Sequence, residues 1–228
     1  MLKHENFWDR LSRYVREPIN GISHFIGVLL SIVALILLVT LSQGDPLRVA
    51  SFAIYGVTSV VLYTASTLLH SLHVDKIWNR RLCLFDHAAI FLLIAGSYTP
   101  ILLVTLRAEH ATLSWTLLSI VWGVALLGII FKLFWLDAPR WLSTGLYLAM
   151  GWLAIIAIVP IAQALSFGGV AWLVAGGIFY SIGAVIFALE KPNWVPGIFG
   201  YHELWHMFVL AGSISHFMMM FHYVLPQA

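Results

Sequence analysis

The feature that most constrains the fold is a series of long apolar segments. A helix that crosses a bilayer needs about 20 mainly apolar residues, and the sequence contains seven such segments. Of its 228 residues, 61% are hydrophobic and 10% are charged, whereas about a quarter of a soluble domain is charged. We therefore predict an all-α integral membrane protein with a seven-transmembrane helix bundle. The predicted spans are 20–41, 48–70, 84–106, 112–134, 141–162, 168–189 and 201–223.

The connections between these spans are short. The longest predicted connection, SLHVDKIWNRRL at 71–82, has about a dozen residues. We expect a single seven-span domain over 1–228, in which 1–18 forms a cytoplasmic, amphipathic segment without a signal-peptide cleavage site. The one cysteine, Cys83, excludes an intrachain disulfide. A net charge of +2 does not suggest nucleic acid as a partner, so the expected partners are the bilayer and its lipids, and the oligomeric state is left open.

Lysine and arginine are concentrated in every second connection. The N-terminal segment and the connections after spans two, four and six carry ten of the twelve Lys and Arg residues. The opposite side carries only Arg48 and Arg107. Because positively charged connections stay in the cytoplasm, the N-terminus is predicted to be cytoplasmic and the C-terminus to lie outside.

This topology brings polar residues of four spans to one depth in the cytoplasmic leaflet. Ionisable residues inside a membrane are costly and mark functional sites or pairs. Helical spacing places those of span two on one stripe with Tyr63. The predicted group consists of Glu17, Asn20, Ser23 and His24 from span one, Ser66 and His70 from span two, Asp86 and His87 from span three, and His202 and His206 from span seven.

The pair His202 and His206 is the strongest indication of a metal site. Two histidines at i and i+4 present both imidazoles on one helix face, and a third nitrogen ligand from another helix would complete a His₃ set. Such a set with one open position is typical of catalytic zinc. Alternatively, the pair hydrogen-bonds to carbonyl groups or to each other. The expected depth of His70 and Asp86 favours the metal.

Two other residues of the group have alternative interpretations. Asp86 is also positioned to pair with Arg80 or Arg81 at the membrane interface. His24 is expected to be a hydrogen-bonding partner rather than a ligand. His216, about 15 Å further along its helix, is too distant to share an ion with His206.

Four motifs together resemble a known family. EPINGISH (17–24), STLLH (66–70), FDHAAIFLLIAGSYTP (85–100) and YHELWH (201–206) resemble the bacterial hemolysin III-type proteins of the progestin and adipoQ receptor family, which includes the adiponectin receptors. The resemblance covers nearly the whole chain. It implies a multi-pass protein of the bacterial cytoplasmic (inner) membrane that acts in membrane-lipid homeostasis.

The resemblance also implies roles for individual residues. His70, His202 and His206 would bind Zn²⁺, although imidazole ligands also suit other divalent metals. Asp86 and Ser66 would be catalytic, beside the water at the open position. From the predicted depth and helical spacing, and not from the resemblance, we expect Glu17, Asn20, Ser23, His24 and Tyr63 to support this site. Because the wider group resembles alkaline ceramidases, the predicted function is zinc-dependent hydrolysis of a lipid amide or ester bond.

The string HELWH matches the H-E-x-x-H motif of zinc proteases, in which the glutamate is the general base. Here Glu203 opens an apolar span, and we interpret it as an acid near the helix N-terminus. Two other functions stay open: a non-enzymatic membrane sensor whose helices are joined by zinc, and, more weakly, a pore-forming haemolysin. A pore requires a polar stripe through the whole membrane, which the spans lack.

Overall fold

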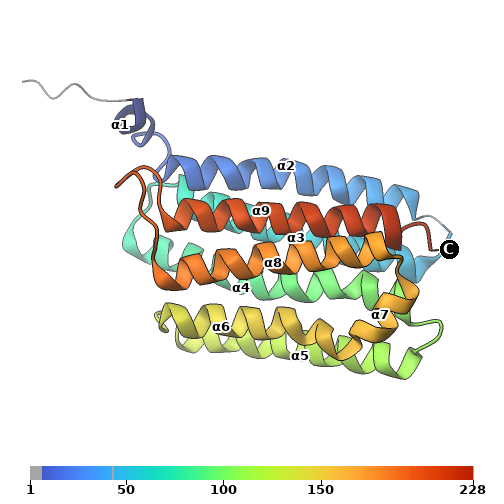
Figure 1. Ribbon diagram of the computed structural model, residues 1–228. Coiled ribbons are helices and arrows are strands. Elements are labelled where there is room, and N and C mark those ends of the chain that lie inside the picture. The colour runs from blue at the N-terminus through green and yellow to red at the C-terminus, as the bar shows by residue number, and fades with distance from the viewer. Residues whose placement is uncertain (1–6, 43, 228) are drawn as a thin grey trace, which may run out of the picture.

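The computed structural model describes residues 7–42 and 44–227 and is built from long helices (Figure 1). Seven helical segments are long and apolar enough to cross a membrane, which confirms the predicted seven-span fold. Residues 1–6 of the predicted cytoplasmic segment 1–18 lie outside the described residues. In chain order the helices are α1 (Phe7–Leu11), α2 (Pro18–Leu41), α3 (Pro46–Ser71), α4 (Lys76–Pro100), η1 (Ile101–Leu106), α5 (Ala111–Phe134), α6 (Arg140–Gly151), η2 (Trp152–Ala157), α7 (Ile158–Ala164), α8 (Phe167–Leu189), α9 (Tyr201–Met219) and η3 (Met220–Val224).

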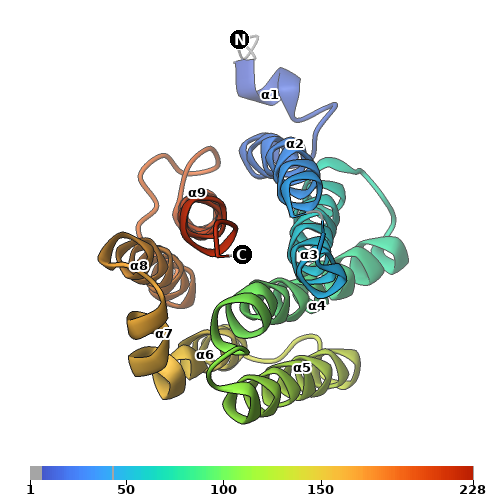
Figure 2. The ribbon, with the colours of Figure 1, turned by 90° about the vertical axis from the view of Figure 1, so that its right-hand side faces the viewer.

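The seven spans form a ring when seen along the bundle (Figure 2). Consecutive helices α2, α3, α4 and α5 pack side by side, α6 packs on α8, and α8 packs on α9. Helix α9 also packs on α2, so the last span returns to the first and closes the ring. We call the end at which α2, α4, α6 and α9 begin the α1 end and the opposite one the far end (Figure 1). The charge distribution predicts that the α1 end is cytoplasmic.

The outer surface of the ring is apolar, as lipid contact requires. On α2, Leu29, Val33 and Ile36 are all at least half exposed. A soluble protein rarely exposes an apolar surface of this kind, whereas the bilayer interior favours it. Trp78 and Trp141, near the α1 end, are also exposed, as is typical of tryptophans at a membrane interface.

The third span begins earlier than predicted. Helix α4 starts at Lys76 rather than near 84, so most of the expected connection 71–82 is helical and only 72–75 link α3 to α4. Asp75 explains the early start, because its carboxylate accepts hydrogen bonds from the backbone N–H groups of Ile77 and Trp78, each at 2.9 Å. Such a cap satisfies donors that the first helical turn leaves free. Residues 76–83 therefore continue α4 as a helix before the predicted apolar segment begins.

The fifth span, predicted as one helix over 141–162, is interrupted in its middle. Helix α6 ends at Gly151, a 3₁₀ segment follows, and α7 begins at Ile158. The hydroxyl of Tyr98 on α4 lies at this break. It donates to the carbonyl of Gly151 at 2.5 Å and accepts from the N–H of Ala154 at 2.7 Å. One side chain thus satisfies backbone groups that an interrupted helix leaves unpaired inside the membrane.

The hydrophobic core lies mainly towards the far end of the bundle. Its fully buried members include Leu38, Phe52, Leu102, Met219 and Val224. Each of these residues belongs to the half of its span that is remote from the α1 end. The half nearer the α1 end holds a smaller apolar cluster, which includes Ala65, Ala89 and Val209, together with polar side chains and a cavity.

Candidate metal centre

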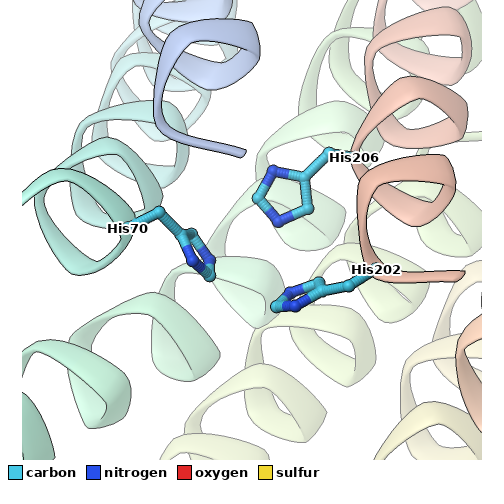
Figure 3. A group of neighbouring side chains, drawn as sticks. All are labelled: His70, His202 and His206. Carbon is cyan, nitrogen blue, oxygen red and sulfur yellow. The ribbon is translucent and has the colours of Figure 1, made fainter. Parts of the chain in front are cut away.

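Three histidines meet near the α1 end of the bundle. His70 is in the last turn of α3, and His202 and His206 occupy the first two turns of α9. Their ring centroids are 4.8–5.0 Å apart, and one ligand atom from each ring lies within 4.8 Å of the others. Figure 3 shows the three rings turned towards a common space. The predicted i, i+4 pair and its partner on another helix are thus brought together.

Glu17 orients one of these rings. The Nδ1 atom of His70 donates to Glu17 Oε2 at 2.7 Å, and the backbone N–H of Glu17 donates to the carbonyl of His70 at 2.8 Å. Burial raises the pKa of Glu17, but hydrogen bonds from His70 and Asn20 outweigh this effect and lower the pKa to about 2. Because Nδ1 is engaged, the Nε2 atom of His70 is left for the common space. A carboxylate in this position is typical of metal-binding histidines.

Asn20 connects Glu17 to helix α9. Its side-chain amide donates to Glu17 Oε2 and to Glu203 Oε1, both at 3.0 Å. The other carboxylate oxygen of Glu203 accepts from the backbone N–H of Gly200 at 2.8 Å. Glu203 therefore caps the N-terminus of α9, as expected for an acid in its first turn. In the H-E-x-x-H motif of zinc proteases this glutamate is the general base. Here Glu203 makes the hydrogen bond of a helix-capping residue instead.

The three other predicted supporting residues pack beside the histidines in different ways. His24 stacks on His206, with ring centroids 3.8 Å apart, and meets the edge of the Tyr63 ring. Neither nitrogen of His24 has a hydrogen-bond partner among the described residues, contrary to the prediction of a hydrogen-bonding role. The Tyr63 hydroxyl donates to Ser213 at 2.7 Å, and Ser23 donates to the carbonyl of its own helix at Asn20. Tyr63 and Ser23 thus support the packing of His24 and α2.

Asp86 and Ser66 line the same cavity as the histidines. Ser66 is buried one helical turn before His70, and its hydroxyl lies next to the Asp86 carboxylate. Asp86 has no salt bridge among the described residues. Arg80 instead pairs with Asp137 at 2.8 Å, and the guanidinium of Arg81 lies 4.8 Å from the centre of the Trp78 ring. The alternative pairing of Asp86 with either arginine is therefore not found.

The cavity has a volume of about 470 Å³ and extends from the histidines into the bundle. Its wall near the histidines carries Glu17, Ser66 and Asp86, and further in it is lined by apolar residues of five spans. Those apolar residues include Leu62, Leu93, Ile94, Leu148, Val174 and Val209. A space of this size is within the range of small-molecule binding sites. It is polar at one end and apolar along its length.

The donor set fits a metal ion. Three imidazoles are the ligands of many catalytic zinc sites, and nitrogen ligands of a tetrahedral zinc lie about 3.3 Å apart, so ring nitrogens within 4.8 Å need only small movements to share one ion. Among the described residues the group contains no fourth ligand. Asp86 and Ser66 line the cavity that the three histidines also line.

One buried cation near the cavity was not expected from the sequence. Lys132 is predicted as part of the positively charged connection after span four, but it is only 1% exposed and lines the cavity. The sequence did contain an indication of this burial, because Lys132 lies two residues inside the predicted end of span four at 134. The same end of span three contributes Cys83 and His87, which also line the cavity.

Fold and site together define a class: a seven-span membrane protein with a candidate three-histidine metal centre near one end of its bundle. The family model for haemolysin-III-related proteins matches residues 12–217, and the chain belongs to this family. It is 46% identical to Hemolysin-3 of Bacillus cereus over 222 residues, which cover 96% of this chain and 97% of that protein. Identity to a Hemolysin-3 homolog of Bacillus subtilis (strain 168) is 45% over 206 residues, covering 89% and 92% of the two chains.

A more distant relationship extends beyond bacteria. The adiponectin receptor protein of Drosophila melanogaster is 26% identical over 162 residues, which cover 65% of this chain and 35% of the receptor. The seven apolar helices and the bacterial relatives support a multi-pass bacterial membrane protein. The predicted membership of the hemolysin III group, within the wider progestin and adipoQ receptor family, is confirmed.

Proposed function

We propose that the protein is a zinc-dependent hydrolase of an amide or ester bond in a membrane lipid. The observation that supports this proposal best is that Asp86 and Ser66 line the same cavity as the three-histidine group. A carboxylate and a hydroxyl beside an incomplete ligand set are the parts that metal-assisted hydrolysis requires.

Each of these residues has a defined task in the proposed reaction. A zinc ion at the three imidazoles supplies a Lewis acid, which polarises a carbonyl group and lowers the pKa of water. Asp86 accepts a proton from the attacking water and passes it to the leaving nitrogen or oxygen. Ser66 donates a hydrogen bond to the carbonyl oxygen as negative charge develops there. The acyl–nitrogen or acyl–oxygen bond breaks, and the released products are a fatty acid and an amine or alcohol.

The cavity favours a lipid over a peptide as substrate. Its apolar inner wall suits an acyl chain, and its polar end lies near the predicted cytoplasmic boundary, at the level of the lipid carbonyl groups. The connections at this end are short, and the longest described one covers residues 190–200. Such connections offer little surface for binding a peptide.

A non-enzymatic sensor is the second candidate. It is favoured by the origin of the ligands, because a metal bound by His70, His202 and His206 would join α3 to α9. In this alternative the metal stabilises one arrangement of the helices and Asp86 has no chemical task. The metal requirement is common to both candidates, so metal binding by the wild type does not distinguish them, whereas lipid turnover does.

Pore formation has less support. The relatives bear the name Hemolysin-3, but beyond the histidines the cavity wall alternates leucine, isoleucine and valine with isolated polar groups such as Ser97 and Tyr180 and, among the described residues, carries no further carboxylate. A conducting pore is lined by polar or charged groups along its length. Lysis of cells on overproduction would not by itself demonstrate a pore.

The test is hydrolysis by the purified protein in a neutral detergent. Zinc-loaded wild type, chelator-treated wild type and Ser66→Ala would be incubated with a ceramide, a diacyl phospholipid and a monoacylglycerol, and the released fatty acid measured by mass spectrometry. We expect release from at least one lipid, its loss with the chelator and its return with zinc. Ser66→Ala should slow it about 10²-fold. Zinc-replete wild type that cleaves none of the three lipids would contradict the enzyme and favour the sensor.

A further inference from the structure

A buried lysine lies in one wall of the cavity. This wall belongs to α4, α5 and α6, which pack together on one side of the ring (Figure 2). Lys132, in the last turn of α5, is 1% exposed. Its Nζ atom donates to Ser143 Oγ at 2.6 Å and to the carbonyl of Leu136 at 3.4 Å. Both acceptors are neutral, and an ammonium group has three donors.

The other cations that line the cavity are paired with carboxylates. Arg16 lies 3.0 Å from Glu17, and Arg140 lies 2.8 Å from Glu190. Among the described residues, Lys132 has no carboxylate within 4.0 Å. The nearby Asp137 forms an exposed pair with Arg80 instead. Lys132 is thus the cavity-lining cation whose charge the described side chains do not neutralise.

An unpaired ammonium inside a protein is costly, because burial removes its hydration. Buried charges are therefore normally paired. Further polar groups surround this one within the cavity: His87 has a buried Nδ1 atom without a hydrogen-bond partner among the described residues, and its Nε2 atom is 4.0 Å from the sulfur of Cys83. The carboxylate of Asp86 lines the same cavity, but among the described residues neither it nor any other carboxylate comes within 4.0 Å of Lys132 Nζ, so the ammonium keeps a donor without a charged partner.

We propose that Lys132 and Ser143 bind an oxyanion, the phosphate or carboxylate of a lipid headgroup, and so hold an anionic lipid in the cavity. The position agrees with this ligand, since basic pockets between spans at the cytoplasmic side bind anionic headgroups. The inference rests on the proposed function in one respect, that the ligand of the cavity is a lipid. It does not require that this lipid is hydrolysed. It adds the class of lipid, because an uncharged lipid would leave Lys132 unpaired.

Lys132 also has a structural role to be separated from binding. A lysine in the last turn of a helix interacts favourably with the helix dipole and the last carbonyl groups. If this were its whole role, replacing it would lower stability and weaken binding of charged and uncharged lipids alike. A selective effect on anionic lipids is the distinguishing result.

The experiment measures equilibrium binding of three radiolabelled lipids to the purified protein in a neutral detergent. The lipids are dioleoyl phosphatidic acid, oleate and the uncharged dioleoylglycerol. All variants carry Asp86→Asn, which prevents turnover during the measurement. Lys132→Met removes the charge at similar volume, Lys132→Arg keeps it, and Lys76→Met removes an exposed cation from the same end of the bundle. If Lys132→Met does not fold, Lys132→Gln removes the charge and retains a donor.

For Lys132→Met we expect affinity for phosphatidic acid or oleate to fall about 10- to 100-fold, as for loss of a hydrogen bond to a charged group. Dioleoylglycerol binding, the Lys76→Met protein and Lys132→Arg should stay within about threefold of the parent. Equal loss for all three lipids, or no loss, would overturn the proposal. Displacement of the lipids by inorganic phosphate would assign the site to a free anion and overturn its lipid part. Selective anionic binding here, combined with zinc-loaded wild type that cleaves none of the lipids in the hydrolysis test, would refute the proposed hydrolase and leave this inference standing.

Discussion

The two ends of the bundle are built from different kinds of residue. At the far end, side chains such as Phe52 and Met219 are completely buried in a continuous hydrophobic core. At the α1 end, the interior holds His70, His206 and Asn20. The difference shows where the chain accepts a cost in stability, because buried polar groups stabilise a fold only when fully satisfied. The far end holds the helices together, and the α1 end holds the groups capable of chemistry.

The largest expected effect of a single change is the loss of metal from the α1 end. His202→Ala removes one of three ligands and is expected to abolish stoichiometric zinc binding, because two imidazoles alone do not make a stable site. The matched control is His216→Ala, a half-buried histidine of the same helix whose ring neighbour is Tyr180 rather than another histidine. Metal content per chain, measured by elemental mass spectrometry of purified protein, checks both.

Wild type and His216→Ala should each contain about one zinc per chain. Equal zinc loss in the two variants would show that metal binding depends on general folding of α9. Zinc retained in His202→Ala would remove this residue from the ligand set. Either result would break the contrast between the two ends.

The second effect separates metal binding from chemistry. Asp86→Asn is expected to lower lipid hydrolysis about 10²- to 10⁴-fold, the usual contribution of a general acid–base group, and to leave zinc content unchanged. Asp137→Asn is the matched control, because Asp137 is exposed and pairs with Arg80 away from the histidines. The initial rate of fatty-acid release and the zinc content are measured on the same samples. Zinc loss in Asp86→Asn would instead make the aspartate a ligand and favour the sensor.

The third effect concerns the far end. Phe52→Ala leaves a cavity in the core and is expected to cost about 2–4 kcal/mol of stability, from lost packing, without changing zinc content. Phe25→Ala, on the lipid-facing surface of α2, is the matched control and should cost much less. The free energy of unfolding is measured by denaturant titration in mixed micelles. A loss of zinc from folded Phe52→Ala protein would show that the two ends are not independent.

The sequence predicts the far end and the histidines from different kinds of signal. Apolar length predicts seven spans, and the i, i+4 spacing of His202 and His206 predicts two ligands on one face. Their meeting with His70 depends on the topology, which the distribution of lysine and arginine indicates. Each of these signals is either a local spacing or a count of residues along the chain, so it can be read from a single sequence.

The remaining features depend on contacts between distant residues. The break in span five has a local signal in Pro160, which lacks a backbone N–H and disfavours a regular helix in the turn before it, but the match of this break to Tyr98 on α4 depends on contact between distant residues. The sequence predicts Lys132 as an interfacial cation. It does not predict the burial of this residue, because that burial depends on how α6 packs beside it. The stacking of His24 on His206 likewise results from the contact between α2 and α9. Interhelical geometry of this kind is not readable from spacing.

The smallest expected effect sharpens the role of the residues around the histidines. Glu17 lies just before α2, contacts His70 through Nδ1 and does not belong to the three-histidine group. Glu17→Gln keeps the hydrogen bond but removes the charge, and it is expected to weaken zinc binding about 10- to 100-fold, as for other residues that support metal ligands. Competition with a fluorescent chelator measures the affinity, and Glu109→Gln, in an exposed connection at the far end, is the control. An affinity equal to that of wild type would mean that the packing of α2 against α3, rather than the charge of Glu17, fixes the His70 ring. A weakening confined to Glu17→Gln would show that the chain before the first span belongs to the functional end of the bundle.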